Sequence, residues 1–586
     1  MADMATTVET LPASGSLLDK KMHKTSAWIS GVIVTLALLG GLAFIGFNMA
    51  QDLGSIKMVS AWPYVLLGVA LLIALGFEFV NGFHDTANAV ATVIYTHSLD
   101  PNIAVVWSGL CNLTGVLMST GAVAFSVVTL LPVELILQVS YGAGFAMVFA
   151  LLIAAIIWNL STWWFGLPAS SSHTMVGSII GVGIANQLMS VHSGTSGVDW
   201  EQATKVFKVL LISPLVGFGC AAILFMALKP KTRALGCALL GLLTAGVAHW
   251  GFSSYWLAAL AIGLGIGGGL WILFRFIPTP EALFRAPEGQ QPPPWPIRAL
   301  LILTCSGVSY FHGSNDGQKG MGLIMLILIG TVPTAYALNH AVPARGVQEF
   351  VTISAQADQV LNRHVNSTGV LGPDARATVT QYIASKELQP DTIIALRELV
   401  NDLSNEVALY KEYKSVPADQ QTNVRNDMYV TSEAIRLMLK NKNPQFSKDE
   451  AAILNKYKSN VDKATKFIPG WVKVAVALAL GLGTMVGWKR IVVTVGEKIG
   501  KEHLTYAQGA CAELVAMGTI FAADNFGLPV STTHVLSSGV AGTMAANQSG
   551  LQISTIRNIA AAWVFTLPAA ALLSGGLFYL FRQLTH

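Results

Sequence analysis

Long apolar runs separated by polar loops make up most of the 586-residue chain. Each run approaches or exceeds the roughly 20 residues that an α-helix needs to cross a bilayer. The runs are 28–50, 103–131, 143–165, 206–228, 256–276, 471–488 and 559–581. This pattern predicts an all-α, polytopic membrane protein.

Composition strengthens that prediction and excludes several other classes. Charged residues make up 12% of the chain, whereas soluble proteins are about 25% charged. The net charge of +4 is too small to indicate a nucleic-acid partner. The five cysteines all lie in apolar runs, which indicates neither a disulfide framework nor a cofactor metal. After the polar tail 1–26, the next run is too long for a signal peptide, so 27–50 is predicted to be an additional N-terminal anchor helix.

Basic loops predict how the chain crosses the membrane. Short loops rich in Lys and Arg prefer the cytoplasm, and three occur, at 20–24, 229–233 and 489–501. All three can be cytoplasmic, with a cytoplasmic N-terminus, only if 143–187 and 505–547 are re-entrant hairpins that return to the side from which they enter. The first hairpin then enters from outside and the second from inside, which is typical of inverted-topology repeats.

Two pairs of segments repeat in the same order along the chain. The pairs are NGFHDTANAVA at 81–91 with HGSNDGQKGMG at 312–322, and GLPASSSHTMVGSIIG at 166–181 with GLPVSTTHVLSSGVAG at 527–542. Asp85 therefore corresponds to Asp316, and Ser171 corresponds to Thr532. Duplication of both elements predicts two related halves built from broken helices.

The duplication also divides the chain into units. We expect a first transport repeat at 61–228, an additional helical hairpin with a Pro-rich linker at 229–296, the first part of the second repeat at 297–340, a polar helical insert at 341–467 and the remainder of the second repeat at 468–586. The same topology makes the insert extracytoplasmic. We expect it to be a solvated helical domain without a part in transport.

The first repeated element places an aspartate next to apolar sequence in each copy, Asp85 after 65–79 and Asp316 after 299–310. An intramembrane carboxylate costs at least about 2.5–3.5 kcal/mol and is tolerated mainly where it faces a cavity, an ion or a partner. Flanking glycines permit local unwinding of the helix, which frees carbonyl groups for a cation. Amide side chains that could add ligand oxygens are Asn81, Asn88 and Asn315. A polar cluster that only joins helices is the alternative.

The second repeated element begins a helix after a Gly-Leu-Pro turn. Proline suits the first helical turn, and the unpaired backbone N–H groups there attract anions. The hydroxyl side chains at the two helix starts are Ser170, Ser171, Ser172, Thr174, Ser531, Thr532 and Thr533. Two such starts that meet near the midplane would form a pocket for a small tetrahedral oxyanion, although helix capping alone is an alternative. We expect His173 and His534 to orient these turns rather than to bind the anion.

These motifs resemble those of the inorganic phosphate transporter (PiT) family in its bacterial low-affinity branch. The stretches that carry the resemblance are NGFHDTANAVATVIYT, GSNDGQKGMG, WNLSTWWFGLPASSSHT, TYAQG and GLPVSTTHVLSSGVAGTM. It covers most of 65–228 and 297–583. The resemblance implies a multi-pass protein of the bacterial inner membrane, usually a homodimer, that imports phosphate by symport and is not an enzyme.

The resemblance also implies roles for single residues. The essential aspartates of the family match Asp85 and Asp316, with Asn88 and Asn315 beside them as ion ligands, and the hydroxyls named above match the phosphate contacts. Some members share a glutamate at Glu513, which would help position the second hairpin. Lys319 is an unusual intramembrane cation that either pairs with an aspartate or attracts the anion.

His84 bears on the coupling ion. Sodium-coupled members of the family tend to have Asn immediately before the first aspartate, where this chain has His84. Because an imidazole titrates near neutral pH, we predict proton coupling, with sodium coupling as the alternative. In the bacterial branch phosphate can also travel as a neutral complex with a divalent metal.

Three other functions compete with phosphate symport. They are a carrier of sulfate or another oxyanion on the same fold, an intramembrane hydrolase and a passive channel. A hydrolase needs one serine activated by one oriented base, and duplicated clusters of adjacent hydroxyls argue against a single nucleophile.

Overall fold

The computed structural model describes residues 27–54, 62–85, 87–131, 136–137, 142–189, 198–251, 256–276, 279–287, 291–365 and 374–584. Within these ranges nearly all regular structure is helical. The one β-type contact there is an isolated antiparallel bridge between Gly500 and Leu551. The all-α class predicted from the apolar runs is therefore confirmed.

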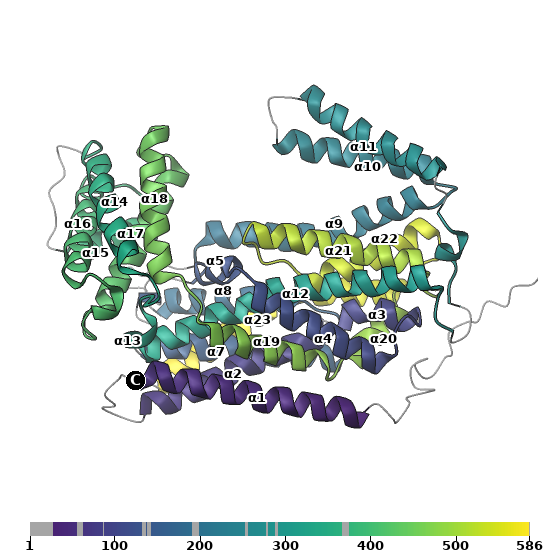
Figure 1. Cartoon of the computed structure of the whole chain (residues 1–586), viewed down its shortest axis with the longest axis horizontal. Helices are drawn as coiled ribbons and strands as arrows, with labels where there is room; N and C mark the ends of the chain where they lie inside the picture. Colours follow the sequence, from purple (N-terminus) through teal and green to yellow (C-terminus); the bar gives the residue numbers. More distant parts are fainter. Residues whose placement is uncertain are drawn as a thin grey trace, which may run out of the picture.

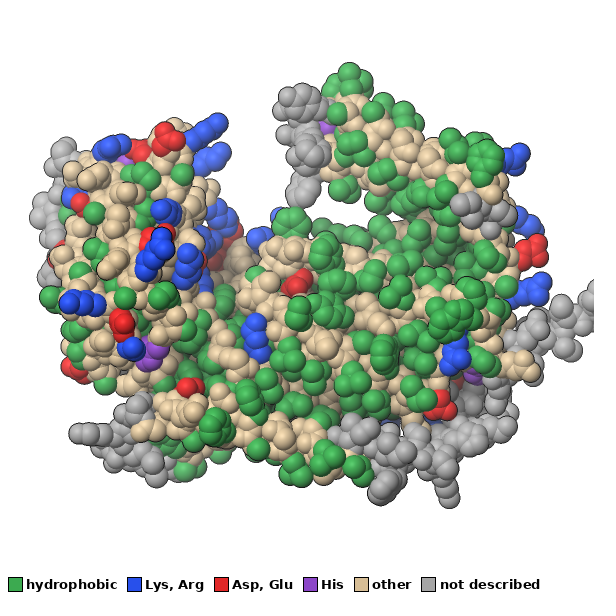
Figure 2. All heavy atoms as spheres, viewed as in Figure 1, with side chains coloured by type: hydrophobic (Ala, Val, Ile, Leu, Met, Phe, Trp, Pro, Cys, Tyr) green, Lys and Arg blue, Asp and Glu red, His purple; other side chains and the backbone are tan. Residues whose placement is uncertain are grey.

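Most of the long helices lie side by side along a common direction (Figure 1). They are α1 (Ala27–Leu53), α2 (Trp62–Asp85), α4 (Pro101–Met118), α7 (Gly142–Trp164), α8 (Ser171–Met189), α9 (Trp200–Leu228), α12 (Trp295–Thr331), α19 (Gly470–Thr484), α21 (Tyr506–Asn525), α22 (Thr532–Asn547) and α23 (Ile553–Leu584). Within the described ranges, seven spans are long and apolar enough to cross a membrane, or eight if α19 and the helix before it form one bent span. Hydrophobic side chains are spread over the face of this bundle seen in Figure 2, where few charged ones appear. The chain is a multi-pass membrane protein.

The apolar run 103–131 does not form a single helix. α4 ends at Met118, and the backbone N–H of Ser119 bonds to the carbonyl of Val116. Gly121 then adopts φ 88°, a left-handed conformation that glycine accepts without strain. The short helix α5 (Ala122–Val128) follows this turn.

The expected unwinding of both aspartate-bearing helices is wrong for the second one. α2 ends at Asp85 and α3 (Ala87–Tyr95) begins two residues later, but α12 continues unbroken past Asp316. The glycines around Asp316 serve close packing instead. A Cβ atom on Gly313 would collide with the backbone of Asn112, and one on Gly320 would collide with the carboxylate of Glu78.

The additional N-terminal helix and the additional helical hairpin lie at the edge of the bundle. α1 packs on α19, where a Cβ on Gly41 would run into Leu478. α10 (Arg233–Gly251) and α11 (Trp256–Phe276) form a hairpin whose helices approach closely at Gly241 and Gly263. This hairpin contacts the rest through α9 and stands apart from the bundle in Figure 1.

Residues 341–467 contain a compact helical domain with a hydrophobic core of its own. Its helices are α14 (Ala344–Asn362), α15 (Ala375–Ser385), α16 (Thr392–Tyr410), α17 (Gln421–Asn441) and α18 (Lys448–Thr465). The short α13 (Pro333–Tyr336) leads into it from α12. Charged side chains gather on this domain (Figure 2). It is anchored to α9, where Lys386 Nζ lies 2.8 Å from Asp199.

This insert lies at one end of the bundle, and α20 (Lys489–Glu497) lies at the other (Figure 1). The turn between α9 and α10, with the basic residues 229–233, lies at the same end as α20. The insert and two of the basic loops are therefore at opposite ends of the bundle.

Candidate functional site

Two helical hairpins carry the repeated Gly-Leu-Pro turns. Hairpin 1 consists of α7 and α8, and hairpin 2 of α21 and α22. Gly166 and Gly527 end the first helix of each hairpin with φ 66° and 62°, the left-handed conformation that favours glycine at this place. The hydroxyls of Ser170 and Ser531 then accept bonds from the backbone N–H three residues later. These two predicted contact residues therefore cap helices.

Each hairpin packs along a helix of the other half of the chain. Hairpin 1 lies against α23, and hairpin 2 lies against α9. A Cβ atom on Gly181 would collide with the backbone at Ala571, and one on Gly542 would collide with the backbone at Phe218. The two turns also touch, since Ser172 Oγ donates to the carbonyl of Val530 at 2.9 Å. The helix starts of α8 and α22 are therefore neighbours.

Hydroxyls from both hairpins reach Asp85. The carboxylate is buried and accepts a bond from Ser171 Oγ and one from Thr533 Oγ1, the latter at 3.0 Å. His84 Nδ1 lies 2.8 Å from the same carboxylate, and its Nε2 lies 3.0 Å from Thr162 Oγ1. One carboxylate on α2 thus joins the starts of α8 and α22.

Asp316 is fully buried and is paired with a lysine. Lys319 Nζ lies 2.5 Å from Asp316 Oδ1 and 2.5 Å from Ser172 Oγ. Of the two alternatives for Lys319, the structure shows the ion pair with an aspartate. The same ammonium group also holds a hydroxyl at the start of α8.

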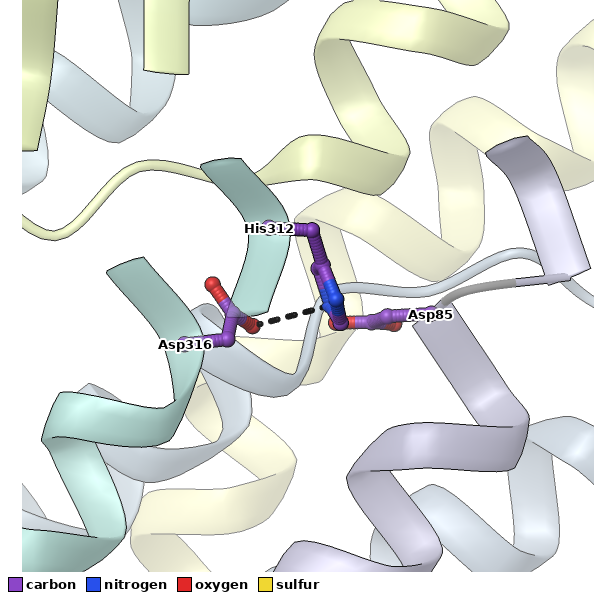
Figure 3. Close-up of side chains that lie close together, drawn as sticks. All are labelled: Asp85, His312 and Asp316. Carbon is purple, nitrogen blue, oxygen red and sulfur yellow. Dashed lines mark ion pairs between the residues drawn. The ribbon is translucent and has the colours of Figure 1, made fainter. Parts of the chain in front are cut away.

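His312 links the two aspartates (Figure 3). One ligand atom from each of Asp85, His312 and Asp316 lies within 4.8 Å of the other two, and all three side chains are buried. His312 Nε2 is 3.6 Å from Asp316 Oδ2, and its Nδ1 is 2.9 Å from Asn112 Oδ1. Two buried carboxylates at this distance repel each other unless a proton or a cation lies between them.

Around the hydroxyl of Ser171, hydrogen-bond acceptors outnumber the protons available for donation. Ser171 Oγ lies 2.7 Å from Asn81 Oδ1 and 3.4 Å from Asp316 Oδ2, in addition to its bond with Asp85. A hydroxyl has a single proton to donate. The arrangement is therefore suited to take up a proton or a cation.

Two further predicted residues, Asn315 and Thr174, form hydrogen bonds with parts of the hairpins. Asn315 holds hairpin 2, because its Nδ2 donates to the carbonyl of Leu528 at 3.1 Å. Thr174 Oγ1 donates to Asn159 Oδ1 on α7 at 2.9 Å. The side chain of Asn88 lies outside the described residues.

Thr532, His173 and His534 lie at the starts of α8 and α22. Thr532 Oγ1 is buried and has no hydrogen-bond partner among the described residues. The rings of His173 and His534 lie 4.4 Å apart between the hairpins, and His534 stacks on Trp563 at 4.1 Å. Glu513 is buried on α21, where it accepts a bond from Thr304 instead of contacting the site.

Two buried residues of the site do not follow from the motif analysis. Glu78 lies on α2, accepts a bond from Asn81 Nδ2 at 3.5 Å, and packs its carboxylate against Gly320 of α12. It is the one carboxylate in the apolar run before Asp85, so the cost of an intramembrane charge could have singled it out. His312 could have been found because it aligns with Asn81 in the repeat.

A model of the phosphate transporter family matches residues 81–574, which include both hairpins and both aspartates. The chain belongs to the phosphate transporter family. The low-affinity inorganic phosphate transporters PitA and PitB of Escherichia coli K12 are 40% and 38% identical to this family member. Each alignment covers 89% of this chain and 97% of the relative.

More distant similarities extend over the same region. A probable low-affinity inorganic phosphate transporter of Bacillus subtilis is 24% identical, with 89% of this chain and 99% of that protein covered. A solved structure described as the sodium-dependent phosphate transporter aligns with a TM-score of 0.48 and 16% identity, and covers 89% of this chain and 99% of its own.

Proposed function

We propose that this family member imports inorganic phosphate across a bacterial inner membrane by symport with protons. The observation that carries the proposal is the convergence of hydroxyls from two hairpins on Asp85, beside Asp316. A site of this kind combines oxyanion donors with acids that can take up a coupling ion.

Phosphate would bind between the starts of α8 and α22. The donors available there are the hydroxyls of Ser171, Ser172, Thr532 and Thr533 and the unpaired backbone N–H groups of two helix starts. Thr532 Oγ1 is already unpartnered within the described chain. Ser171 and Thr533, by contrast, donate to Asp85, and Ser172 accepts from Lys319. Phosphate must therefore compete with carboxylates for the same hydroxyls.

That competition provides the coupling. A proton on Asp85 or Asp316 removes the negative charge that holds the hydroxyls, so they become free to donate to phosphate. His84 contacts both Asp85 and Thr162 and can carry the proton. Sodium prefers oxygen ligands, and the imidazole of His312 between the aspartates favours a proton over sodium. Divalent metal that accompanies phosphate would travel as cargo.

Transport then requires the site to open alternately to each side. We infer that hairpins 1 and 2 are re-entrant parts of two inverted repeats, since each packs on a helix of the opposite half. Rocking of one half against the other would move the turns and the aspartates together. A homodimer in the membrane, with a cytoplasmic N-terminus, completes the proposal.

Uptake of radiolabelled phosphate into reconstituted vesicles tests this function, with pH, sodium and magnesium varied independently. An inward proton gradient should drive accumulation without sodium, and excess sulfate should not compete. Uptake that needs a sodium gradient would contradict proton coupling, and vesicles that accumulate no phosphate under any condition would contradict the proposed function itself.

A further inference from the structure

A second group of polar donors lies outside the hairpin site, where the insert meets the bundle. An open surface cavity of about 510 Å³ lies there, lined by residues of α18 of the insert and of the turn before α5. Three lysines line it: Lys458 and Lys463 on α18, and Lys466 directly after the helix ends. The hydroxyls of Ser459 and Thr120 line it as well.

The charge of this cavity is positive. Its one carboxylate, Asp462, is already occupied, because it lies 2.6 Å from Lys458 Nζ and 2.8 Å from Lys466 Nζ and accepts a bond from Ser432. Burial raises the pKa of the Asp462 carboxyl, but the two lysines more than offset this, so its pKa lies below the usual value. Lys463 makes no ion pair with any described residue. Three cations therefore face one ionised and fully engaged acid.

One residue that lines the cavity, Ala122, lies next to the turn of hairpin 2. A Cβ atom on Gly527, in the turn of hairpin 2, would lie 3.5 Å from the Cβ of Ala122, which lines the cavity. The next residue, Val123, donates its backbone N–H to Gln318 at 3.0 Å, two positions after Asp316 on α12. The segment 122–123 therefore joins the lining of the cavity to the neighbourhood of the hairpin turn.

We propose that this cavity binds free phosphate before the ion reaches the hairpin turns, so that the insert serves as a capture site. The inference rests on the proposed phosphate uptake. Clustered charge of one sign raises the local concentration of an oppositely charged substrate, and exposed charges lose this effect as ionic strength rises. The insert lies at the end of the bundle away from the basic loops 229–233 and 489–501. Because such loops favour the cytoplasm, the lysines would face the side from which phosphate arrives.

Lys463→Gln tests the capture site, because it removes one charge without leaving Asp462 unpaired. In intact cells that lack other phosphate carriers, we expect KM for external phosphate to rise about threefold to tenfold, with the maximal rate unchanged. Lys463→Arg should restore the wild-type KM. The matched control is Lys448→Gln, an exposed lysine at the opposite end of the same helix that does not line the cavity. Equal KM values for the Lys463→Gln and Lys448→Gln variants would overturn the inference.

The phosphate groups of lipids carry the same charge and acceptor oxygens as free phosphate. A second experiment therefore distinguishes the two ligands. Vesicles of phosphatidylcholine alone should preserve the effect of Lys463→Gln on KM. An effect that appears only when phosphatidylglycerol is added would assign the cavity to lipid headgroups and overturn capture of free phosphate. Wild-type protein that transports no phosphate would refute the proposed function, whereas wild-type transport with an unaltered Lys463→Gln variant would refute only the capture site.

Discussion

At the residue scale, the hydroxyl of Ser171 concentrates the chemistry of the site. It contacts Asn81 and both aspartates with one proton to share. The proposed mechanism predicts that the acids retain the hydroxyl in the unprotonated site and release it to an anion when a proton is bound. In the proposed mechanism, substrate affinity and proton binding are linked through the same atoms, which is the condition for symport.

Removing the turn hydroxyls should weaken phosphate binding. Hydrogen bonds to charged groups contribute about 1.5–3 kcal/mol, so Ser171→Ala and Thr532→Val should each raise KM by about tenfold or more. Ser178→Ala is the matched control, because the Ser178 hydroxyl bonds only to its own helix, at the carbonyl of Thr174. Initial rates of uptake over a range of phosphate concentrations give the result, and unchanged KM in both turn variants would rule out these contacts.

At the element scale, close packing at glycine fixes the hairpins in place. Gly181 and Gly542 occupy the same place in the repeat, and each presses its helix against the backbone of a helix from the other half. Backbones in a membrane can approach this closely only where a side chain is absent. The position of the turns relative to the aspartates depends on these contacts.

Gly181→Ala should therefore destabilise the protein, because the new methyl group would collide with the backbone of α23. Overpacking of this kind costs about 1–3 kcal/mol. Gly576→Ala, on α23 itself, has open space around the new methyl group and is the control. Thermal unfolding in detergent should show a lower Tm for Gly181→Ala alone, and equal Tm values for the two variants would contradict the packing account.

The same elements show what the sequence could and could not predict. Apolar runs and Gly-Leu-Pro turns locate the helices and hairpins, because both signals are local. The continuity of α12 through Asp316 was not predictable from glycines alone, since glycine permits unwinding and also permits close contact, and only the neighbour Asn112 decides between them. The contact of His312 with Asn112 is likewise a property of two helices and not of either motif.

At the scale of the whole molecule, the bundle has two different ends. The insert occupies one end, and the basic loops 229–233 and 489–501 occupy the other (Figure 1). The lysine-lined cavity belongs to the end with the insert. Because such loops favour the cytoplasm, the insert should face outward. In this orientation, phosphate that arrives from outside meets the proposed capture site before the hairpin site.

Cysteine labelling tests that orientation. A membrane-impermeant thiol reagent added to spheroplasts should label Lys442→Cys, which is exposed on the insert, and should not label Lys231→Cys, which is exposed between α9 and α10. Labelling of Lys231→Cys should appear only after the membrane is permeabilised. The reverse pattern would place the insert in the cytoplasm and remove the argument for external capture.

The account as a whole depends on paired acids that respond to the coupling proton. Phosphate uptake driven by a proton gradient in vesicles that contain Asp85→Asn or Asp316→Asn tests this most directly, with Asp449→Asn on the exposed surface of the insert as control. We predict that net uptake falls by about 100-fold or more in each site variant, as expected for loss of a group that transfers the proton, and stays at the wild-type rate in the control. Proton-driven uptake at the wild-type rate in both site variants would contradict the account.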